Sequence, residues 1–341
     1  MFRILCIEGY VENNLGDDLM FKNIIENTNY DEYIVLGSEN GITYPIKKKI
    51  KFISKEKFKR IIIKDFFLKF KSKNIDLAYV GGSLFMDRGN GKVARGKQRF
   101  SFLCRLLGIK TFVVGSNLGP IHNEKRYTKN ILKFSKLVQN WSVRDKFSYN
   151  FLRNLGVQNV QMLPDIVFST DIKDFKIKND KKVCISIIRY EDASKRYDSK
   201  NSENYYKDII EWANYFHKNG YSVKLLSFHN QADISISNEL IKEIPFAEIV
   251  SYEGENILEE ISTSEYIIAT RFHSAILGAL FGKKMVVYSY NSKTKNYLDS
   301  KNFEILKFGE KKDIKLFGKL EVKNSEIENS FEHSRKLMIG K

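Results

Sequence analysis

The chain has 341 residues, enough for two separate hydrophobic cores, and its 43% hydrophobic content is typical of a globular protein. A formal net charge of +16 favours an acidic substrate or an anionic surface as partner, although a lysine-rich surface can also be merely solvating. We expect no nucleic-acid partner, because the basic residues are scattered and no nucleic-acid-binding motif occurs.

The cysteines and the apolar segments indicate the compartment. Cys6, Cys104 and Cys184 are far apart, and each lies within an apolar segment. This pattern predicts buried reduced thiols rather than disulfides or a metal site. No segment approaches the roughly 20 apolar residues of a membrane span, and the apolar stretch 2–7 is too short for a signal peptide. We therefore expect a cytoplasmic protein, with peripheral contact to the inner face of a membrane as an option.

Strands and helices alternate along the first half of the chain, as short apolar runs followed by segments of helical periodicity. The expected strands are 3–7, 32–37, 76–80, 110–114, 140–143 and 160–168. The expected helices are 19–26, 100–107, 125–138 and 145–155, with an amphipathic helix within the very basic segment 47–73. Such alternation predicts an α/β domain with a parallel sheet.

The second half restarts the alternation after a charged segment, 171–182, that has no apolar face. Its expected strands are 183–188, 222–227, 249–252, 266–269 and 284–290, and its expected helices are 203–218, 234–244, 257–262 and 274–281. We therefore predict a Rossmann-like domain over 1–172, a linker over 173–182, a second Rossmann-like domain over 183–315 and a basic tail over 316–341.

The segment 266–281 is the best candidate for chemistry. Arg271 and His273 are predicted in a very short loop between a buried strand and a helix. The carboxyl ends of parallel strands bind ligands, and a helix amino terminus attracts anions. Although a single histidine is more often structural, its neighbours here favour a site for a small, strongly negative molecule.

Two further cations follow apolar strands in the same half. Arg189 ends one expected strand, and Lys293 follows another. Parallel strands end at one edge of a sheet, so both side chains can join Arg271 there. A solvated surface is the alternative, but arginine suits a carboxylate or a phosphate through paired hydrogen bonds.

The first half offers glycine-bearing loops at 16, 81–82 and 115–119 instead of cations. Glycine at these places is most often a tight turn. The loops lack Rossmann and P-loop spacing, and no HExxH, CxxC or GxSxG motif occurs.

The order of several short motifs is that of a known family. They are Asn14-Leu-Gly-Asp17, Gly81-Gly82, Gly115 with Gly119-Pro-Ile121, Ser142-Val-Arg-Asp145 with Gly156, Leu163-Pro-Asp165, Arg271-Phe-His273 and the stretch from Tyr288 to Lys293. Through them the chain resembles the polysaccharide pyruvyl transferase family over most of residues 1–300. Two departures, Ser83 where many members have a third glycine and Ser116-Asn117 in the next loop, leave the acceptor open.

The resemblance implies a fold like that of GT-B glycosyltransferases, with two Rossmann-like domains facing across a cleft. It implies transfer of pyruvate from phosphoenolpyruvate to two hydroxyls of a sugar, free or lipid-linked, with release of phosphate. Phosphoenolpyruvate carries a carboxylate and a phosphate on three carbons and needs fixed cations. His273 is then the expected acid that protonates the enol, and no metal or other cofactor is expected. The expected donor-binding residues are Arg189, Arg271, Phe272 and Lys293, and the expected acceptor-binding residues are Asp17, Gly82, Asn117 and His122.

Two other functions fit the same features. A GT-B glycosyltransferase would use the arginines and the helix terminus to hold the diphosphate of a sugar nucleotide. A non-catalytic binder of anionic glycans or membrane surfaces would rest on the net charge alone. The identity of the donor separates the first two functions, whereas an intact site without turnover would indicate the third. The sequence leaves the oligomeric state and the pathway undetermined.

Overall fold

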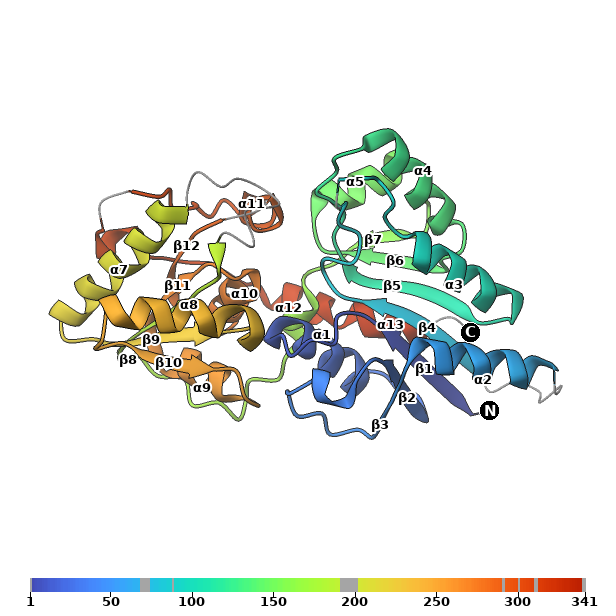
Figure 1. Ribbon diagram of the computed structural model, residues 1–341, viewed down its shortest axis with the longest axis horizontal. Helices are drawn as coiled ribbons and strands as arrows, with labels where there is room; N and C mark the ends of the chain where they lie inside the picture. The colour runs from blue at the N-terminus through green and yellow to red at the C-terminus, as the bar shows by residue number, and fades with distance from the viewer. Residues whose placement is uncertain are drawn as a thin grey trace. The chain divides into compact units, whose positions relative to one another are not determined.

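The computed structural model describes residues 2–67, 74–87, 89–190, 202–289, 292–299, 301–309 and 312–338. The chain divides into two compact units, each built around its own sheet (Figure 1). Unit 1 contains Met1–Glu12, Asp17–Ser169 and Ser325–Lys341, and unit 2 contains Asn13–Gly16 and Thr170–Asn324. The short segment Asn13–Gly16 therefore groups with unit 2, although its neighbours on both sides belong to unit 1.

Unit 1 has a seven-stranded parallel sheet in the order β3-β2-β1-β4-β5-β6-β7. Its strands are β1 (Arg3–Glu8), β2 (Glu32–Leu36), β3 (Ile50–Ile53), β4 (Asn74–Val80), β5 (Lys110–Ser116), β6 (Asn140–Val143) and β7 (Val160–Met162). The strand order reverses between β1 and β4. The carboxyl ends of β4, β5, β6 and β7 lie along one edge, which is where a doubly wound sheet binds ligands.

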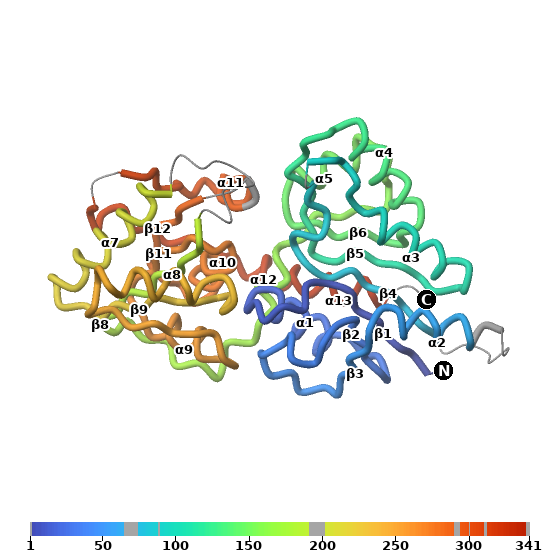
Figure 2. Tube along the Cα trace, in the orientation of Figure 1, coloured from blue at the N-terminus to red at the C-terminus, as the bar shows by residue number. Residues whose placement is uncertain are grey.

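Helices cover both faces of this sheet. They are α1 (Leu15–Glu26), α2 (Lys55–Phe67), α3 (Arg95–Leu106), α4 (Glu124–Ser135), α5 (Lys146–Asn154), α12 (Asn324–Ser330) and α13 (Glu332–Met338). Helices α2 to α5 contribute Phe58, Phe100, Phe134 and Leu152 to one core against the sheet. Right-handed crossovers place α1 on the other face, and the tube in Figure 2 lets this path be followed.

Unit 2 has a six-stranded sheet in the order β10-β9-β8-β11-β12-β13, with only β13 antiparallel. Its strands are β8 (Asp180–Ser186), β9 (Ser222–Ser227), β10 (Glu248–Ser251), β11 (Ser264–Ala269), β12 (Lys284–Val287) and β13 (Gly318–Lys319). Its helices are α7 (Ser202–Lys218), α8 (Asn230–Glu243), α9 (Asn256–Thr263), α10 (Phe272–Leu280) and α11 (Ser292–Asp299). Two doubly wound α/β units confirm the predicted fold class.

The apolar runs become strands because these strands are buried on both faces. Leu5, Cys6 and Ile7 of β1 are all fully buried, as are Val183 and Ile185 of β8. Parallel strands covered by helices on both sides need such continuous runs. All three cysteines are buried free thiols, as predicted. Burial raises the pKa of Cys104 and of Cys184 to about 12, so both remain protonated thiols at neutral pH.

Several element boundaries differ from the prediction. Strand β3 lies inside the basic segment 47–73, ahead of the expected amphipathic helix, which is α2. Strand β7 ends at Met162 rather than at 168. Strand β8 starts at Asp180, within the expected linker. Lys283 Nζ donates hydrogen bonds to the Lys178 carbonyl and to Asn179, so the end of that linker is packed on unit 2.

The end of the chain also differs from the predicted basic tail. Its helices α12 and α13 form, and the residues from Ser325 onward group with unit 1. The reason is buried packing: His333, Ser334 and Leu337 are all less than 4% exposed. The buried side of these helices was not predicted, because the many positive charges of the segment dominate its sequence pattern. None of the helices in the described parts of the chain is both long and apolar enough to span a bilayer.

Candidate active site

The junction of β11 and α10 carries the predicted arginine and histidine. Arg271 is the N-cap of α10, with extended backbone angles, and Ser274 N donates to its carbonyl oxygen at 3.0 Å. The helix starts at Phe272 rather than at 274, so the prediction that His273 lies in a loop is wrong. Instead, His273 lies in the first helical turn. Its position is therefore set by helix geometry, at the end of the helix that attracts anions.

Two buried serines hold this junction in place. Ser186, the last residue of β8, accepts hydrogen bonds through Oγ from Thr270 N at 2.9 Å and Arg271 N at 3.2 Å. Its Oγ lies 2.7 Å from Ser274 Oγ, which in turn donates to the Arg271 carbonyl at 2.6 Å. The two hydroxyls thus tie neighbouring strand ends to the helix start. Neither serine was predicted from the sequence; for Ser186 the signal was a small polar residue at the end of an apolar strand, whereas Ser274 lies inside α10.

The Arg271 guanidinium is oriented by a buried carboxylate. Arg271 forms an ion pair with Asp233 of α8, whose side chain is 0% exposed, whereas the Arg271 side chain is 18% exposed. Asp233 also accepts a hydrogen bond from His229 N at 3.0 Å. A guanidinium has five N–H donors in a planar fork, so it can hold a carboxylate on one side and bind an anion on the other. No feature of the sequence of α8 marked Asp233 as the partner.

The second arginine is brought to the same helix. Arg189 Nη2 forms an ion pair with Glu239 Oε1 at 2.5 Å and a hydrogen bond with Ser235 Oγ at 3.0 Å. Both Arg189 and Arg271 therefore contact α8, as expected of residues that follow neighbouring strands β8 and β11. Each arginine already has a carboxylate partner. An anion that binds there would therefore share the guanidinium group with that carboxylate.

The other two predicted donor-binding residues are Phe272 and Lys293. Phe272 is buried, and its ring packs edge-to-face against Tyr297 with the ring centres 5.5 Å apart. The contact indicates a packing role in seating α10 against α11. Lys293 belongs to α11, but its side chain lies outside the described residues. Its predicted role in donor binding remains a prediction.

A glycine from the beginning of the chain lies directly beside the histidine. Residues 13–16 dock on unit 2: Asn14 forms a β-bridge with His229, and Leu15 N donates to the Phe228 carbonyl at 3.0 Å. A Cβ atom on Gly16 would lie 1.7 Å from His273 Nδ1, far inside any allowed contact. Only glycine therefore fits at position 16 with the ring in this place. This contact puts Gly16 beside the predicted donor residues rather than with the other glycine loops.

Unit 1 has a buried polar cluster at the carboxyl edge of its sheet. Arg144 donates through Nη1 to Asp165 Oδ2 at 2.5 Å and through Nη2 to Asn117 Oδ1 at 3.0 Å. Gly82 lies against it, since a Cβ there would be 2.0 Å from Arg144 Nη2. Asn117 N donates to the Gly82 carbonyl at 2.8 Å. The structure thus joins two predicted acceptor residues, Gly82 and Asn117, through Arg144, which belongs to the motif Ser142-Val-Arg-Asp145.

One atom of this cluster lacks a partner. Asn117 is only 3% exposed, and its Nδ2 forms no hydrogen bond with any of the described residues. A buried amide donor without a partner costs free energy, so such a group normally meets a ligand or a water molecule. Asn117 Nδ2 is therefore a candidate for contact with a hydroxyl.

The remaining predicted acceptor residues lie in different settings. Asp17 is half-buried in the first turn of α1, where a carboxylate also stabilises the helix dipole. His122 is exposed, and its backbone N–H donates to Asp87 Oδ2 at 3.0 Å. Burial alone would raise the pKa of Asp87, but hydrogen bonds from four backbone N–H groups hold that pKa below its usual value. The turn that carries His122 is thus anchored, while its imidazole faces solvent.

A histidine that the sequence analysis did not single out supports this edge of unit 1. His333 of α13 is 1% exposed. Its Nδ1 lies 2.7 Å from Ser142 Oγ and its Nε2 lies 2.7 Å from the Pro164 carbonyl oxygen. The carbonyl can only accept, so Nε2 carries the proton and Ser142 donates to Nδ1. Burial lowers the pKa of His333 to about 4. The neutral ring fixes the residue next to Asp165.

Metal ligands are not grouped in the described parts of the chain, where no three His, Cys, Asp or Glu side chains cluster as a metal ion would need.

Comparison with known proteins decides the family. The sequence profile of the polysaccharide pyruvyl transferases matches residues 14–292, which include both polar clusters. The chain belongs to the polysaccharide pyruvyl transferase family. The matched region begins at Asn14, in the segment whose Gly16 packs beside His273. No curated protein sequence matches the chain significantly.

Solved structures resemble this pyruvyl transferase family member in fold. The UDP-GlcNAc 2-epimerase from Neisseria meningitidis matches with a TM-score of 0.56 and 13% identity, over 99% of this chain and 91% of that one. The UDP-GlcNAc 2-epimerase from Methanocaldococcus jannaschii matches with a TM-score of 0.56 and 11% identity, over 99% of this chain and 100% of that one. These are GT-B fold proteins, so the predicted GT-B-like fold is confirmed. At such low identity the likeness extends to the fold alone.

Proposed function

We propose that this protein transfers pyruvate from phosphoenolpyruvate to two hydroxyls of a saccharide in polysaccharide biosynthesis, forming a pyruvate ketal and releasing phosphate. The observation that carries the proposal is the placement of Arg271 and His273 at the start of α10, in a chain of the polysaccharide pyruvyl transferase family. A cation is thereby held at the N-cap of a helix, and an imidazole in its first turn.

The donor part of the proposal rests on charge. Phosphoenolpyruvate bears a carboxylate and a phosphate, which favour a guanidinium fork and the amino terminus of α10. Arg271 is pre-oriented by Asp233, so little side-chain entropy is lost when it binds an anion. Arg189 offers a second guanidinium along the same helix α8. This set suits a small dianion or trianion.

The chemical step needs an acid. His273 transfers a proton to the methylene carbon of phosphoenolpyruvate, and the positive charge that develops on the neighbouring carbon is attacked by a sugar hydroxyl. As the new C–O bond forms, that hydroxyl gives its proton to the now neutral His273, which is thereby restored. The second hydroxyl then displaces phosphate and its proton leaves with the phosphate, so the carbon ends with two sugar oxygens. Phosphate leaves with the original enol oxygen, and no electrons are gained or lost overall.

The acceptor part rests on the buried cluster of unit 1. Asn117 Nδ2 is a buried donor whose partner can be a sugar hydroxyl, and Gly82 brings backbone close to it. The pair Arg144–Asp165 holds the Asn117 carbonyl so that the amide group points in one direction. Neutral hydrogen-bonding groups of this kind suit a polyhydroxyl ring.

The proposal is tested by incubating the protein with phosphoenolpyruvate and a panel of saccharides. Release of inorganic phosphate is followed together with the mass of the saccharide, which should increase by one ketal-linked pyruvate. His273→Gln should lower turnover by about 100- to 10,000-fold while leaving phosphoenolpyruvate binding intact. His217→Gln is the matched control, because His217 is exposed on α7 and stacks on Phe246. Release of nucleotide from a UDP-sugar, with phosphoenolpyruvate inert, would instead support a glycosyltransferase.

A further inference from the structure

The outer side of α3 in unit 1 has an unusual composition. The exposed residues of this helix include Arg95, Arg99, Phe102 and Leu106, which recur at intervals of three or four and therefore form one stripe, with the exposed Arg105 next to Leu106. The chain has no aspartate or glutamate from position 89 to 123. The stripe is therefore purely cationic and apolar, whereas the solvent side of a helix usually mixes charges of both signs.

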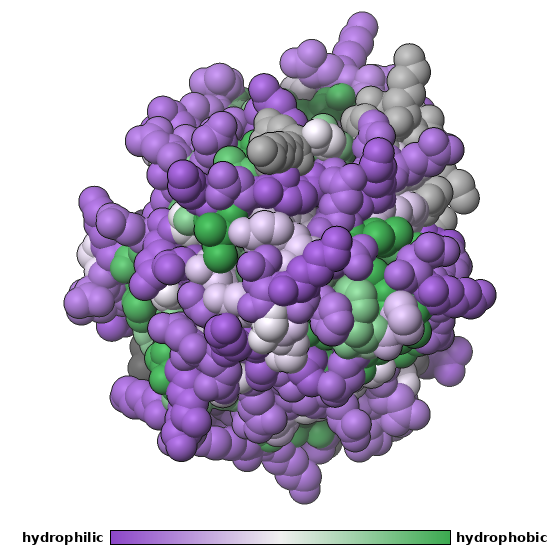
Figure 3. Space-filling view, turned by 90° about the vertical axis from the view of Figure 1, so that its left-hand side faces the viewer, coloured by the Kyte–Doolittle hydropathy of each residue, from purple (hydrophilic) through white to green (hydrophobic). Residues whose placement is uncertain are grey.

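The apolar members of the stripe are large and well exposed. Phe102 is 54% exposed and Leu106 is 62% exposed, and on the neighbouring helix α2 Ile61 is 40% and Ile63 is 37% exposed. Single exposed apolar residues are ordinary, but Phe102 and Leu106 are four residues apart and therefore lie on one face of α3. By contrast, Figure 3 faces unit 2 and shows a mainly hydrophilic surface with small, separate hydrophobic patches.

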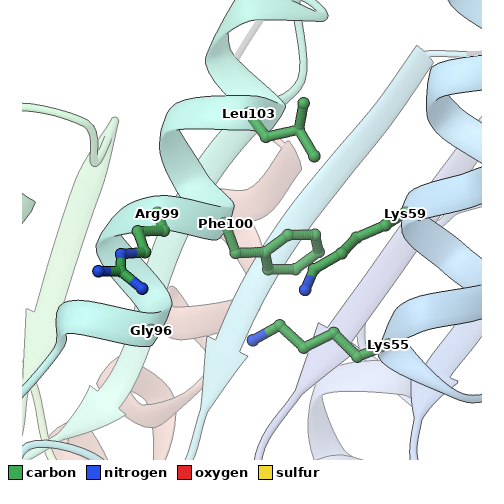
Figure 4. Close-up of a pocket in the computed structure, with 6 residues that line it drawn as sticks. All are labelled: Lys55, Lys59, Gly96, Arg99, Phe100 and Leu103. Carbon is green, nitrogen blue, oxygen red and sulfur yellow. The ribbon is translucent and has the colours of Figure 1, made fainter.

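Cations line a pocket on one side of α3. Figure 4 shows this pocket, of about 480 Å³, between α2 and α3. Lys55 and Lys59 reach from α2 towards the ring of Phe100, with Nζ 4.5 Å and 5.7 Å from the ring centre. Lys55 also forms an ion pair with Glu8 at 2.6 Å. Arg99 completes the rim of the pocket.

A second pocket, of about 530 Å³, lies on the other side of α3, towards α4. Its lining includes Arg95, Arg99 and Phe102 of α3, with Lys133 and Lys136 from α4 and the turn after it. Arg105 Nη1 donates to the Lys136 carbonyl at 2.9 Å, so the two helices are tied together at this end. Basic pockets therefore lie on both sides of α3, and the exposed Phe102 lines the second of them.

We propose that this surface of α2, α3 and α4, here called the basic face, binds the surface of an anionic lipid bilayer. Phospholipid headgroups occupy the basic pockets, while Phe102 and Leu106 enter the boundary between headgroups and acyl chains. Two features favour a bilayer over an acidic protein. The arginines lie next to large apolar side chains on the same helix, and their long stems can lie along apolar surface while the guanidinium groups reach the phosphates.

Vesicle binding tests this proposal independently of catalysis. The full-length protein is sedimented with vesicles of phosphatidylcholine alone and of phosphatidylcholine mixed with phosphatidylglycerol. We expect binding only to the mixed vesicles, weakening as salt rises. The triple variant Arg95→Gln, Arg99→Gln, Arg105→Gln should lower the affinity by about 100-fold. The double variant Phe102→Ser, Leu106→Ser should lower it by about tenfold without changing the charge.

A matched control separates the basic face from net charge. The triple variant Lys173→Gln, Lys218→Gln, Lys242→Gln removes the same charge from exposed positions of unit 2 and should bind like wild type. All the substituted residues are exposed. Melting temperatures equal to that of the wild-type protein should therefore verify that each variant is folded. Equal losses in the two triple variants would mean that only net charge matters and would overturn the proposal. Absence of wild-type binding to the mixed vesicles, or full binding by the double variant, would also overturn it.

Discussion

Gly16 and His273 are packed so closely that a methyl group on the glycine would lie 1.7 Å from Nδ1 of the histidine. The glycine is held there by its own segment, since Gly16 N donates to Asn14 Oδ1 at 3.1 Å and Leu15 N donates to Phe228 O. The imidazole is fixed by the first turn of α10. Two rigid backbones therefore define where the ring can be.

This contact predicts that Gly16→Ala lowers turnover although His273 is still present. The methyl group must displace the ring, and a shift of about 1 Å in a catalytic group can cost about 100-fold in rate. The measurement is kcat for phosphate release, with circular dichroism to verify folding. Gly96→Ala is the control, because a Cβ at Gly96 meets no atom within 4 Å. A Gly16→Ala protein with wild-type kcat would show that the ring position does not matter.

The ion pair at α8 predicts that Arg271→Lys weakens phosphoenolpyruvate binding. Lysine keeps the charge but cannot hold Asp233 and a ligand with one planar fork, so the dissociation constant should rise about tenfold or more. Calorimetric titration measures it. Arg153→Lys is the comparison, because the Arg153 guanidinium donates to the carbonyl and the side chain of Gln158, well away from α8 in the sequence. Equal affinity for the two variants would remove Arg271 from the donor site.

The unpartnered amide predicts a selective effect of Asn117→Asp. Aspartate can still accept from Arg144 but has no Nδ2 donor, so the acceptor's Michaelis constant should rise about fivefold or more. Binding of phosphoenolpyruvate to the enzyme without acceptor should stay nearly unchanged. Both constants are measured on the same preparation. If the substitution instead abolishes donor binding in a folded protein, Asn117 serves the donor rather than the acceptor.

The buried histidine predicts acid sensitivity. His333 has a pKa of about 4 in the folded protein, because burial disfavours its charged form, against about 6.5 when unfolded. Between these values the unfolded chain binds more protons, so the free energy of unfolding falls as pH falls, by about 3 kcal/mol in total. Denaturant unfolding across this pH window measures the loss. His333→Asn should be less stable at neutral pH yet show a flatter pH dependence; an unchanged slope would exclude His333 as the source.

The fold was largely predictable because most of its strands are continuous apolar runs buried on both faces. Strand β3 was missed because its residues are only partly buried or exposed, and lysines interrupt its apolar pattern. The start of α10 was placed too late because neither Arg271 nor Phe272 is a typical helix-start residue. Helices α12 and α13 were missed because their packing depends on distant residues such as Ser142 and Pro164.

The candidate site was predictable where a short motif carries it. Arg271 and His273 stand two residues apart, so their proximity is local. Asp233, Ser186 and Gly16 contact them only through the fold, and none belongs to a local pattern that marks this role. The same holds for Arg144, whose contacts with Asn117 and Asp165 join the ends of different strands.

The identity of the donor is the central claim, and ligand-induced stabilisation tests it most directly. A ligand that binds only the folded state raises the melting temperature, and the rise grows with the logarithm of the ratio of ligand concentration to dissociation constant. We predict that phosphoenolpyruvate raises the melting temperature of the wild-type protein, raises that of Arg271→Lys less, and that UDP-sugars raise neither. Stabilisation by a UDP-sugar with no effect of phosphoenolpyruvate would contradict the account.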